Sequence, residues 1–386
     1  MRRRRFAFIT GVPAGVGGLG VQSGNALRAL ALCSAEVHAI GPAPAAGWIS
    51  PPNVVWHVSP PAWTPFFRWT PLRRRSGVVQ HIADWRVGRF AAECLERVKP
   101  DLCYGFTQVS LESLRWAQNH GVPSVLESPN GHIRPFRRIY VDEARRWCGT
   151  RYAGHPTPAM VRRVEAEYAL ASRIRVSSEW ARTSLSSSGV SSANIKVLQQ
   201  PVDLVRFTPR HNAPRAGDAL RVSYVGSLDL RKGFVYLLRA ARELPHAVAI
   251  ELVGGTGDRC CRFLLERERA GLDVTVAPGD PRPAFARADV FVLPTLEDGS
   301  PFAVAEAMAC GVPVITTTAT GAAEWVRPGE TGWLAEPACA GSLAAALTVA
   351  RENRASLRAM GREARADTER RVASCDESVR EWIEHQ

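Results

Sequence analysis

The chain has 386 residues, of which 46% are hydrophobic and 22% are charged. This composition is typical of a globular protein with about two domains, and it excludes disordered and collagen-like classes. The net charge of +12 comes entirely from residues 1–200, which carry +14, whereas residues 201–386 carry −2; a basic half indicates either an anionic partner or a solvated basic surface.

Residues 1–5 are basic like the start of a signal peptide, but the apolar run that follows, residues 6–9, is too short to continue one. No apolar run approaches the roughly 18 residues that span a bilayer, so we expect a soluble cytoplasmic protein. The nine cysteines contain no C-x-x-C pair, which argues against a disulfide framework and a structural zinc site.

Short apolar runs alternate with longer amphipathic ones along the first half. They predict strands at residues 5–10, 36–40, 54–58, 101–105, 123–127 and 173–177, and helices at 19–33, 79–98, 111–120 and 158–171. This alternation predicts βαβ units, and therefore a parallel sheet covered on both faces.

The alternation restarts after a proline-rich stretch at residues 200–218. Strands are predicted at 220–225, 247–253, 274–277, 290–293 and 312–316, and helices at 232–244, 259–270, 302–310, 341–351, 355–371 and 375–385. We therefore predict two Rossmann-like domains, at 1–199 and 219–371, joined by a linker at 200–218. A C-terminal helix at 372–386 either stays with the second domain or returns to the first. In open parallel sheets ligands bind at the carboxyl ends of the strands, so the predicted site is a cleft between the two domains.

A glycine-rich loop follows the first predicted strand. Gly15, Gly17 and Gly20 match G-x-G-x-x-G, but several residues separate this motif from the strand and no acidic residue ends the second strand. The loop is therefore not typical of dinucleotide binding. It is either a ligand loop whose bare backbone approaches a phosphate at a helix start, or a tight turn.

Two further loops follow strands of the second half. The first carries Lys232, one of only three lysines, at a predicted helix start where it can neutralise a diphosphate or remain solvated. The second carries Glu297 and Asp298, then Pro301 and a helix with Glu306 about one turn inside. Free N–H groups at such a helix start bind anions, whereas a buried carboxylate such as Glu306 is costly without a partner.

These motifs resemble those of retaining glycosyltransferases of the GT-B fold, family 4. Asp298 and Glu306 stand eight apart and are followed by Ala-Met-Ala-Cys-Gly-Val-Pro-Val, like the acid-x7-acid signature of that family. Further matches are Val-Gly-Ser-Leu and Lys-Gly at 225–233, Gly-Ala-Ala-Glu at 321–324, Gly-Glu-Thr-Gly-Trp-Leu at 329–334, and Gly-Gly-Leu-Gly at 17–20. The end-of-domain segment of the family matches at 177–180 and 201–209, and the resemblance is weaker over residues 40–120.

The resemblance implies a role for each matching residue. Lys232 would hold the diphosphate of a nucleoside-diphosphate sugar, Glu306 would bind its ribose, and Asp298 would bind the hydroxyls of the transferred sugar. Other implied donor contacts are Gly17, Gly18, Pro301, Phe302 and Ala303. The resemblance implies no metal ion and no cofactor other than this co-substrate.

The sequence departs from the family pattern at three positions. Ser227 stands where an arginine is frequent, and Arg231 is the nearest replacement for its charge. The first acid of the signature is Asp298 rather than a glutamate, which shortens its reach to the sugar. The histidine that often ends the strand at 123–127 is replaced by His132, a few residues later, which is either catalytic or a buried loop histidine.

We therefore predict a metal-independent glycosyl transfer with retention, in which the departing phosphate itself takes the proton of the acceptor hydroxyl. No side-chain nucleophile is evident. The alternatives are another GT-B activity, such as a sugar-nucleotide epimerase, and a catalytically silent sugar-nucleotide-binding subunit. No nucleic-acid-binding motif accompanies the basic charge.

A segment rich in tryptophan and arginine, residues 48–89, interrupts the first half. Rings and basic side chains together suit a membrane interface, an anionic or lipid-linked acceptor, or an inward-folded aromatic cluster. Among these we favour peripheral contact with the inner face of the membrane, and the acceptor itself stays open.

Overall fold

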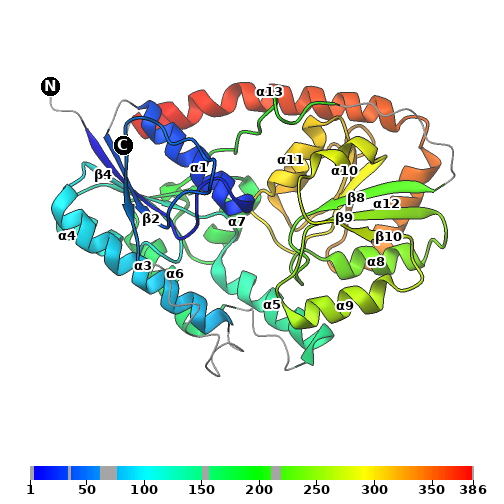
Figure 1. Ribbon diagram of the computed structural model, residues 1–386, viewed down its shortest axis with the longest axis horizontal. Coiled ribbons are helices and arrows are strands. Elements are labelled where there is room, and N and C mark those ends of the chain that lie inside the picture. Colours follow the sequence, from blue (N-terminus) through cyan, green and yellow to red (C-terminus); the bar gives the residue numbers. More distant parts are fainter. Residues whose placement is uncertain (1–3, 34–35, 61–75, 150–155, 210–218, 385–386) are drawn as a thin grey trace. The chain divides into compact units, whose positions relative to one another are not determined.

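The computed structural model describes residues 4–33, 36–60, 76–149, 156–209 and 219–384 (Figure 1). The chain forms two compact units. The first comprises Met1–Arg137, Ala153–Gln200 and Ser374–Gln386, and the second comprises Arg138–Tyr152 and Pro201–Ala373.

The first unit is built on a parallel sheet, seven-stranded within the described residues, in the order β3-β2-β1-β4-β5-β6-β7. Its strands are β1 (Arg5–Ile9), β2 (Glu36–Gly41), β3 (Val54–Val58), β4 (Leu102–Phe106), β5 (Ser124–Glu127), β6 (Arg173–Val176) and β7 (Ile195–Val197). Its helices are α1 (Gly17–Leu32), α3 (Ser76–Val98), α4 (Leu111–Asn119), α6 (Pro158–Leu170), α7 (Glu179–Ser186) and the 3-10 turn η3 (Ser192–Asn194). Figure 1 shows α1 and α3 on opposite faces of this sheet, as right-handed βαβ crossovers require.

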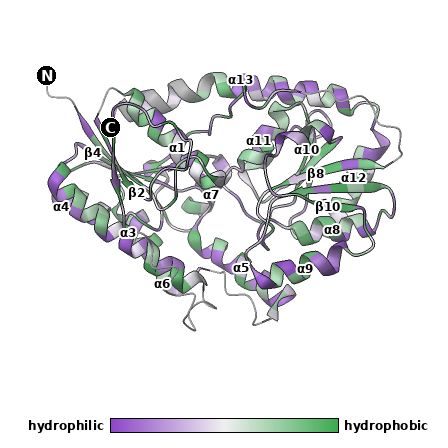
Figure 2. Cartoon of the chain, in the orientation of Figure 1, coloured by the Kyte–Doolittle hydropathy of each residue, from purple (hydrophilic) through white to green (hydrophobic). Residues whose placement is uncertain are grey.

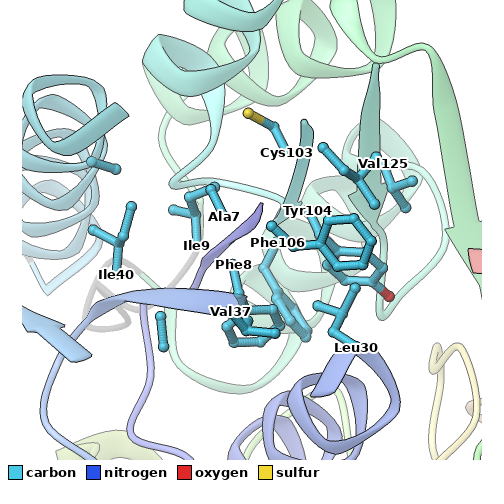
Figure 3. Close-up of a cluster of buried hydrophobic side chains, with 14 of the residues drawn as sticks. Ala7, Phe8, Ile9, Leu30, Val37, Ile40, Cys103, Tyr104, Phe106 and Val125 are labelled. Carbon is cyan, nitrogen blue, oxygen red and sulfur yellow. The ribbon is translucent and has the colours of Figure 1, made fainter. Parts of the chain in front are cut away.

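The core of the first unit lies between the sheet and these helices (Figure 3). Phe8 is fully buried, and its ring lies 5.9 Å from the rings of both Tyr104 and Phe106. Because both faces of a parallel sheet are covered, its central strands are apolar almost throughout. Figure 2 shows the outer helices, such as α3, carrying both hydrophilic and hydrophobic residues.

A buried ion pair, Glu127 with Arg175, lies within the first unit. Glu127, at the end of β5, is fully buried, and its carboxylate accepts hydrogen bonds from Gln22 (2.5 Å), Gln200 (3.2 Å), Arg175 (3.1 Å) and the hydroxyl of Tyr104. Several donors and a guanidinium compensate the loss of water around this charge. The network therefore fixes the carboxyl ends of three neighbouring strands.

The second unit has a parallel sheet, six-stranded within the described residues, in the order β10-β9-β8-β11-β12-β13. Its strands are β8 (Leu220–Val225), β9 (Val248–Val253), β10 (Val274–Val276), β11 (Val290–Leu293), β12 (Val314–Thr317) and β13 (Gly332–Ala335). Its helices are α8 (Phe234–Arg242), α9 (Arg259–Arg269), α10 (Arg282–Arg287), α11 (Phe302–Ala309), α12 (Ala340–Glu352) and the 3-10 turn η4 (Gly321–Trp325). Figure 1 shows α8 and α9 on one face of this sheet and α10 and α11 on the other.

Two helices contain residues of both units. Helix α5 (Ile133–Trp147) begins in the first unit and ends in the second, and α13 (Leu357–Glu384) begins in the second and ends in the first. Trp382, near the end of α13, packs against the core of the first unit. Residues 138–152 were predicted to belong to the first domain. They group with the second unit, because the end of α5 contacts residues of that unit.

A disulfide joins the end of α5 to the start of α9. Cys148 and Cys260 are bonded across a sequence separation of 112 residues. The sequence argued against a framework of disulfides, and spacing gave no sign of this single cross-link, because its two cysteines meet only once the second unit has folded. Among the described residues no helix is long and apolar enough to cross a membrane.

Candidate functional site

The loops that follow β8 and β11 lie together, because these two strands are neighbours in the second sheet. The backbone carbonyl of Arg231 accepts hydrogen bonds from the N–H of Leu296 (2.8 Å) and the hydroxyl of Thr295 (3.2 Å). Gly233, with φ of 72°, precedes α8, and a Cβ there would lie 2.0 Å from the carbonyl oxygen of Pro294. Glycine is therefore needed for the two loops to approach this closely.

Two cations share one carboxylate at this junction. Oδ2 of Asp298 contacts Lys232 Nζ and lies 3.0 Å from Nη1 of Arg231. Burial by itself would raise the pKa of Asp298, but the attraction of Lys232 and Arg231 outweighs it and holds that pKa below its ordinary value. The buried Asp298 is therefore ionised and paired on both sides.

Arg231 has further partners. Its Nη1 donates to the backbone carbonyl of Glu297 at 2.6 Å and lies 3.5 Å from the Glu297 carboxylate. Its Nε donates to the hydroxyl of Tyr140 at 3.4 Å. Arg231, the predicted replacement for the charge missing at Ser227, is thus paired with acidic groups of its own unit. Ser227 is exposed and donates a hydrogen bond to Asp229 at 2.6 Å.

The start of α11 lies a few residues beyond Asp298. Pro301 is the buried N-cap residue, and none of the described side chains caps this end of the helix. Phe302 and Ala303, both half-buried, supply the first N–H groups of the helix. Uncapped N–H groups with the positive end of the helix dipole favour an anion.

Glu306 lies one turn into α11, where it is half-buried. Within the described part of the chain, no hydrogen bond or ion pair reaches its carboxylate. Burial raises the pKa of Glu306 to about 7; nearby Arg206 lowers it and Asp280 raises it further. A carboxyl in this state can accept hydrogen bonds from a ligand, because no donor among the described residues matches its lone pairs.

The predicted residues of the first unit lie in two places. Gly17 and Gly18 are exposed at the start of α1, with open space where a Cβ would stand. His132 is buried, its ring 5.2 Å from that of Tyr168, and its Nδ1 accepts a hydrogen bond from the N–H of Arg134 at 3.3 Å. Burial lowers the pKa of His132, which leaves the ring neutral; Glu165 opposes this shift and Arg134 adds to it.

The aromatic residues of 48–89 divide between surface and interior, while residues 61–75 lie outside the described part of the chain. Trp48 is half-buried, packing beside Gly15 and 6.1 Å from the ring of Trp56. Trp85, on α3, is 45% exposed and lies beneath Arg89. Searching the described residues finds no group of three His, Cys, Asp or Glu side chains arranged for a metal ion.

Sequence reasoning missed the contribution of α5 to this site. Tyr140 is buried and reaches Arg231. In the same helix Glu143 accepts a hydrogen bond from the hydroxyl of Tyr236 at 2.7 Å. Apolar residues at 133, 136, 140, 144 and 147 recur at helical spacing, a signal that could have predicted the helix but not its membership of the second unit.

Part of the chain is similar to known glycosyltransferases. Residues 219–353 match the family model of glycosyl transferases group 1. WcaL of Salmonella typhimurium, named as a glycosyltransferase of colanic acid biosynthesis, is 34% identical over 187 residues, and the match covers 45% of each chain. The GDP-mannose-dependent alpha-(1-6)-phosphatidylinositol monomannoside mannosyltransferase of Mycolicibacterium smegmatis is 33% identical over 182 residues, covering 40% of this chain and 46% of that one. The matched region thus spans less than half of these relatives.

Solved structures resemble the chain over nearly its whole length. Sucrose-phosphate synthase from Thermosynechococcus elongatus has a TM-score of 0.75 at 20% identity, covering 99% of this chain and 97% of that one. HepE from Anabaena, in complex with UDP-glucose, has a TM-score of 0.71 at 16% identity, covering 99% of this chain and all of that one. The predicted GT-B class and the predicted resemblance to its glycosyltransferases are confirmed.

Proposed function

Since the chain has the GT-B fold and residues 219–353 match glycosyl transferases group 1, we propose that the protein is a retaining, metal-independent glycosyltransferase. It moves a sugar from a nucleoside-diphosphate sugar to an acceptor hydroxyl. The observation that carries the proposal is the cluster of Lys232, Arg231 and Asp298 at the carboxyl ends of β8 and β11. Helix α11 follows in the chain, and Glu306 lies on it with no hydrogen bond or ion pair from the described residues.

In this proposal the donor diphosphate binds Lys232 and the first N–H groups of α11, at Phe302 and Ala303. These are charge-assisted contacts, about twice as strong as neutral ones. The Glu306 carboxylate accepts the ribose hydroxyls, which would supply the hydrogen-bond donors that the described residues do not. We keep Gly17 and Gly18 as further phosphate contacts, because side chains do not obstruct their backbone.

The reaction follows from where charge develops. As the bond between sugar and phosphate breaks, negative charge grows on the leaving diphosphate, which Lys232 and the helix start stabilise. The acceptor hydroxyl attacks the same face of the sugar that the diphosphate leaves, and its proton passes to the departing phosphate oxygen. Asp298 orients the sugar hydroxyls, and no covalent enzyme intermediate is required. In the same proposal, the Nε2 atom of His132 contacts the acceptor.

The acceptor class is proposed from charge. Residues 1–200 carry +14, which suits an anionic or lipid-linked acceptor. Two relatives have names of that kind, the phosphatidylinositol mannoside enzyme above and a D-inositol 3-phosphate glycosyltransferase of Corynebacterium jeikeium. Exposed Trp85 beside Arg89 is compatible with peripheral membrane contact; co-sedimentation with anionic vesicles at low salt supports that contact, and protein left in the supernatant refutes it.

A donor screen tests the function. UDP-, GDP- and ADP-sugars are incubated with a cell extract as acceptor pool, with and without EDTA, and products are identified by mass spectrometry and their anomeric configuration by NMR. We expect transfer with retention that survives EDTA, and a loss of about 10²–10³ in kcat for Lys232→Ala. Lys196→Ala, which removes an exposed lysine of β7 in the other unit, is the matched control. Sugar-nucleotide turnover without an acceptor would favour an epimerase, and no turnover with intact nucleotide binding would favour a silent subunit.

A further inference from the structure

The two cations on Asp298 are held very differently. Arg231 is fixed at both ends: its carbonyl is bound by the loop after β11, and its guanidinium contacts Glu297, Asp298 and Tyr140. For Lys232, the N–H donates to Asp229 at 3.0 Å, but among the described residues its Nζ has one acceptor, Asp298. Both side chains are largely buried, 12% and 14% exposed.

Tyr140 is itself held firmly, because segment Arg138–Tyr152 is anchored on the second unit at several points. The disulfide Cys148–Cys260 joins it to α9. The hydroxyl of Tyr236, on α8, donates to Glu143 and accepts from Arg146, both at 2.7 Å. Arg239 lies over the ring of Trp147, 4.2 Å from its centroid. The hydroxyl of Tyr140 is thereby kept at Nε of Arg231.

We propose that Arg231 is the resident counter-ion of Asp298 and Lys232 its exchangeable one, and that Tyr140 positions Arg231 for this role. The inference rests on the proposed function, in which Lys232 binds the donor diphosphate. When the diphosphate arrives, Lys232 leaves Asp298 and turns to the phosphate, which its flexible stem and three rotatable donors allow. Arg231 stays, so Asp298 remains ionised and correctly oriented for the sugar. Without Arg231, the departure of Lys232 would leave a buried carboxylate unpaired, which is strongly unfavourable.

The exchange predicts that Asp298 competes with the nucleotide for Lys232. UDP and GDP are first titrated into wild type by calorimetry, and the nucleotide that binds more tightly is used for the variants. Asp298→Asn should bind this nucleotide about tenfold more tightly than wild type, because the carboxylate that competes for Lys232 is gone. Arg231→Gln should bind about tenfold more weakly, because Lys232 is then the one cation among the described residues that contacts the Asp298 carboxylate. The double variant Arg231→Gln/Asp298→Asn should bind as tightly as Asp298→Asn alone, about tenfold more tightly than wild type, because Arg231 then has no Asp298 charge to balance.

The double variant decides between two roles for Arg231. If Arg231 contacted the phosphates directly, its removal would weaken binding by the same factor with or without Asp298. Such additivity would leave the double variant with about wild-type affinity and overturns the inference, whereas binding as tight as that of Asp298→Asn alone supports it. The double variant also removes both members of a buried pair together, which is better tolerated than removing one; a thermal melt shows that each variant is folded.

Further variants separate the failure of this inference from that of the proposed function. If Lys232→Ala binds the nucleotide as wild type does, or if neither UDP nor GDP binds wild type, the assigned donor site is wrong and the inference falls with it. If Lys232→Ala binds weakly but the double variant is additive, only the inference falls. Tyr140→Phe should weaken binding two- to threefold, whereas Tyr236→Phe, which loosens the same segment without touching Arg231, should not. Equal effects of the two would refute the role of Tyr140.

Discussion

The variant Glu306→Gln tests two effects of the half-buried Glu306 carboxyl. Its ionisation lowers the stability of the folded protein, and the ionised form binds the nucleotide. The pKa of Glu306 is raised to about 7 from an ordinary 4.5. Because the folded state holds this proton more tightly than the unfolded chain, the contribution to stability is fully present below about pH 4.5 and is lost as the pH rises to about 7. At about 1.4 kcal/mol per pH unit, the loss is at most about 3 kcal/mol.

Urea denaturation at pH 5, 6, 7 and 8 measures this loss. The free energy of unfolding of Glu306→Gln, taken relative to wild type, should increase over this range by up to about 3 kcal/mol, because the amide carries no charge. Glu352→Gln, which changes an exposed carboxyl at the end of α12, is the matched control and should show no such trend. A difference that stays constant from pH 5 to 8 would refute the argument that ionised Glu306 is costly.

Nucleotide binding should respond in the opposite direction. In wild type the affinity for UDP or GDP should rise between pH 6 and 8, as the Glu306 carboxylate forms and accepts the ribose hydroxyls. In Glu306→Gln the affinity should be about tenfold lower at pH 8 and nearly independent of pH, because a carboxylate that accepts two hydroxyls contributes about 1.5–3 kcal/mol. A variant that is more stable but weaker in binding is the expected signature of a functional carboxyl.

Two other features give predictions that do not depend on the proposed function. His38 and His57 are joined by a hydrogen bond of 3.0 Å, and the pKa of each is lowered, chiefly by burial. The contribution of this pair to stability should therefore be fully present above about pH 6.5 and be lost as the pH falls below it. Thermal melts at pH 5 and 7 should show a smaller loss of stability in His57→Gln than in wild type. Closing a loop of 112 residues with Cys148–Cys260 should stabilise the protein by up to about 5 kcal/mol. A dithiol reductant should therefore lower the urea midpoint of wild type but not of Cys148→Ser, and equal shifts in both proteins would contradict the assignment.

The sequence predicted that Lys232 and Asp298 each lie in a loop after a strand of the second half. Both follow strands, and the carboxyl ends of parallel strands lie at one edge of a sheet. It could not predict that their charges pair with each other before any ligand binds, because such pairing depends on side-chain geometry across neighbouring loops. The same limit applies to Glu306, whose unusual pKa comes from burial that only the packed helix α11 creates.

Other elements were missed because local signals were weak or contradictory. Helix α5 has Pro135 in its first turn and several arginines, which obscured its apolar spacing. Strands β7 and β13 are short edge strands at the ends of their sheets, and little of either is apolar and buried. The predicted helices at 355–371 and 375–385 are one continuous helix, α13, since the residues between them do not include a proline or glycine that would break it.

The interleaved composition of the two units has a consequence for synthesis on the ribosome. Neither unit is a continuous stretch of chain: the second needs Arg138–Tyr152 from the middle of the first, and the first needs Ser374–Gln386 from the end. When residues 1–200 have left the ribosome, the end of α5, with Tyr140 and Cys148, has no second unit to pack against. The core of the first unit also still lacks Trp382. Folding cannot proceed one finished domain after another, as is usual for chains of this size, and recombinant fragments cut at residue 200 should both be incomplete.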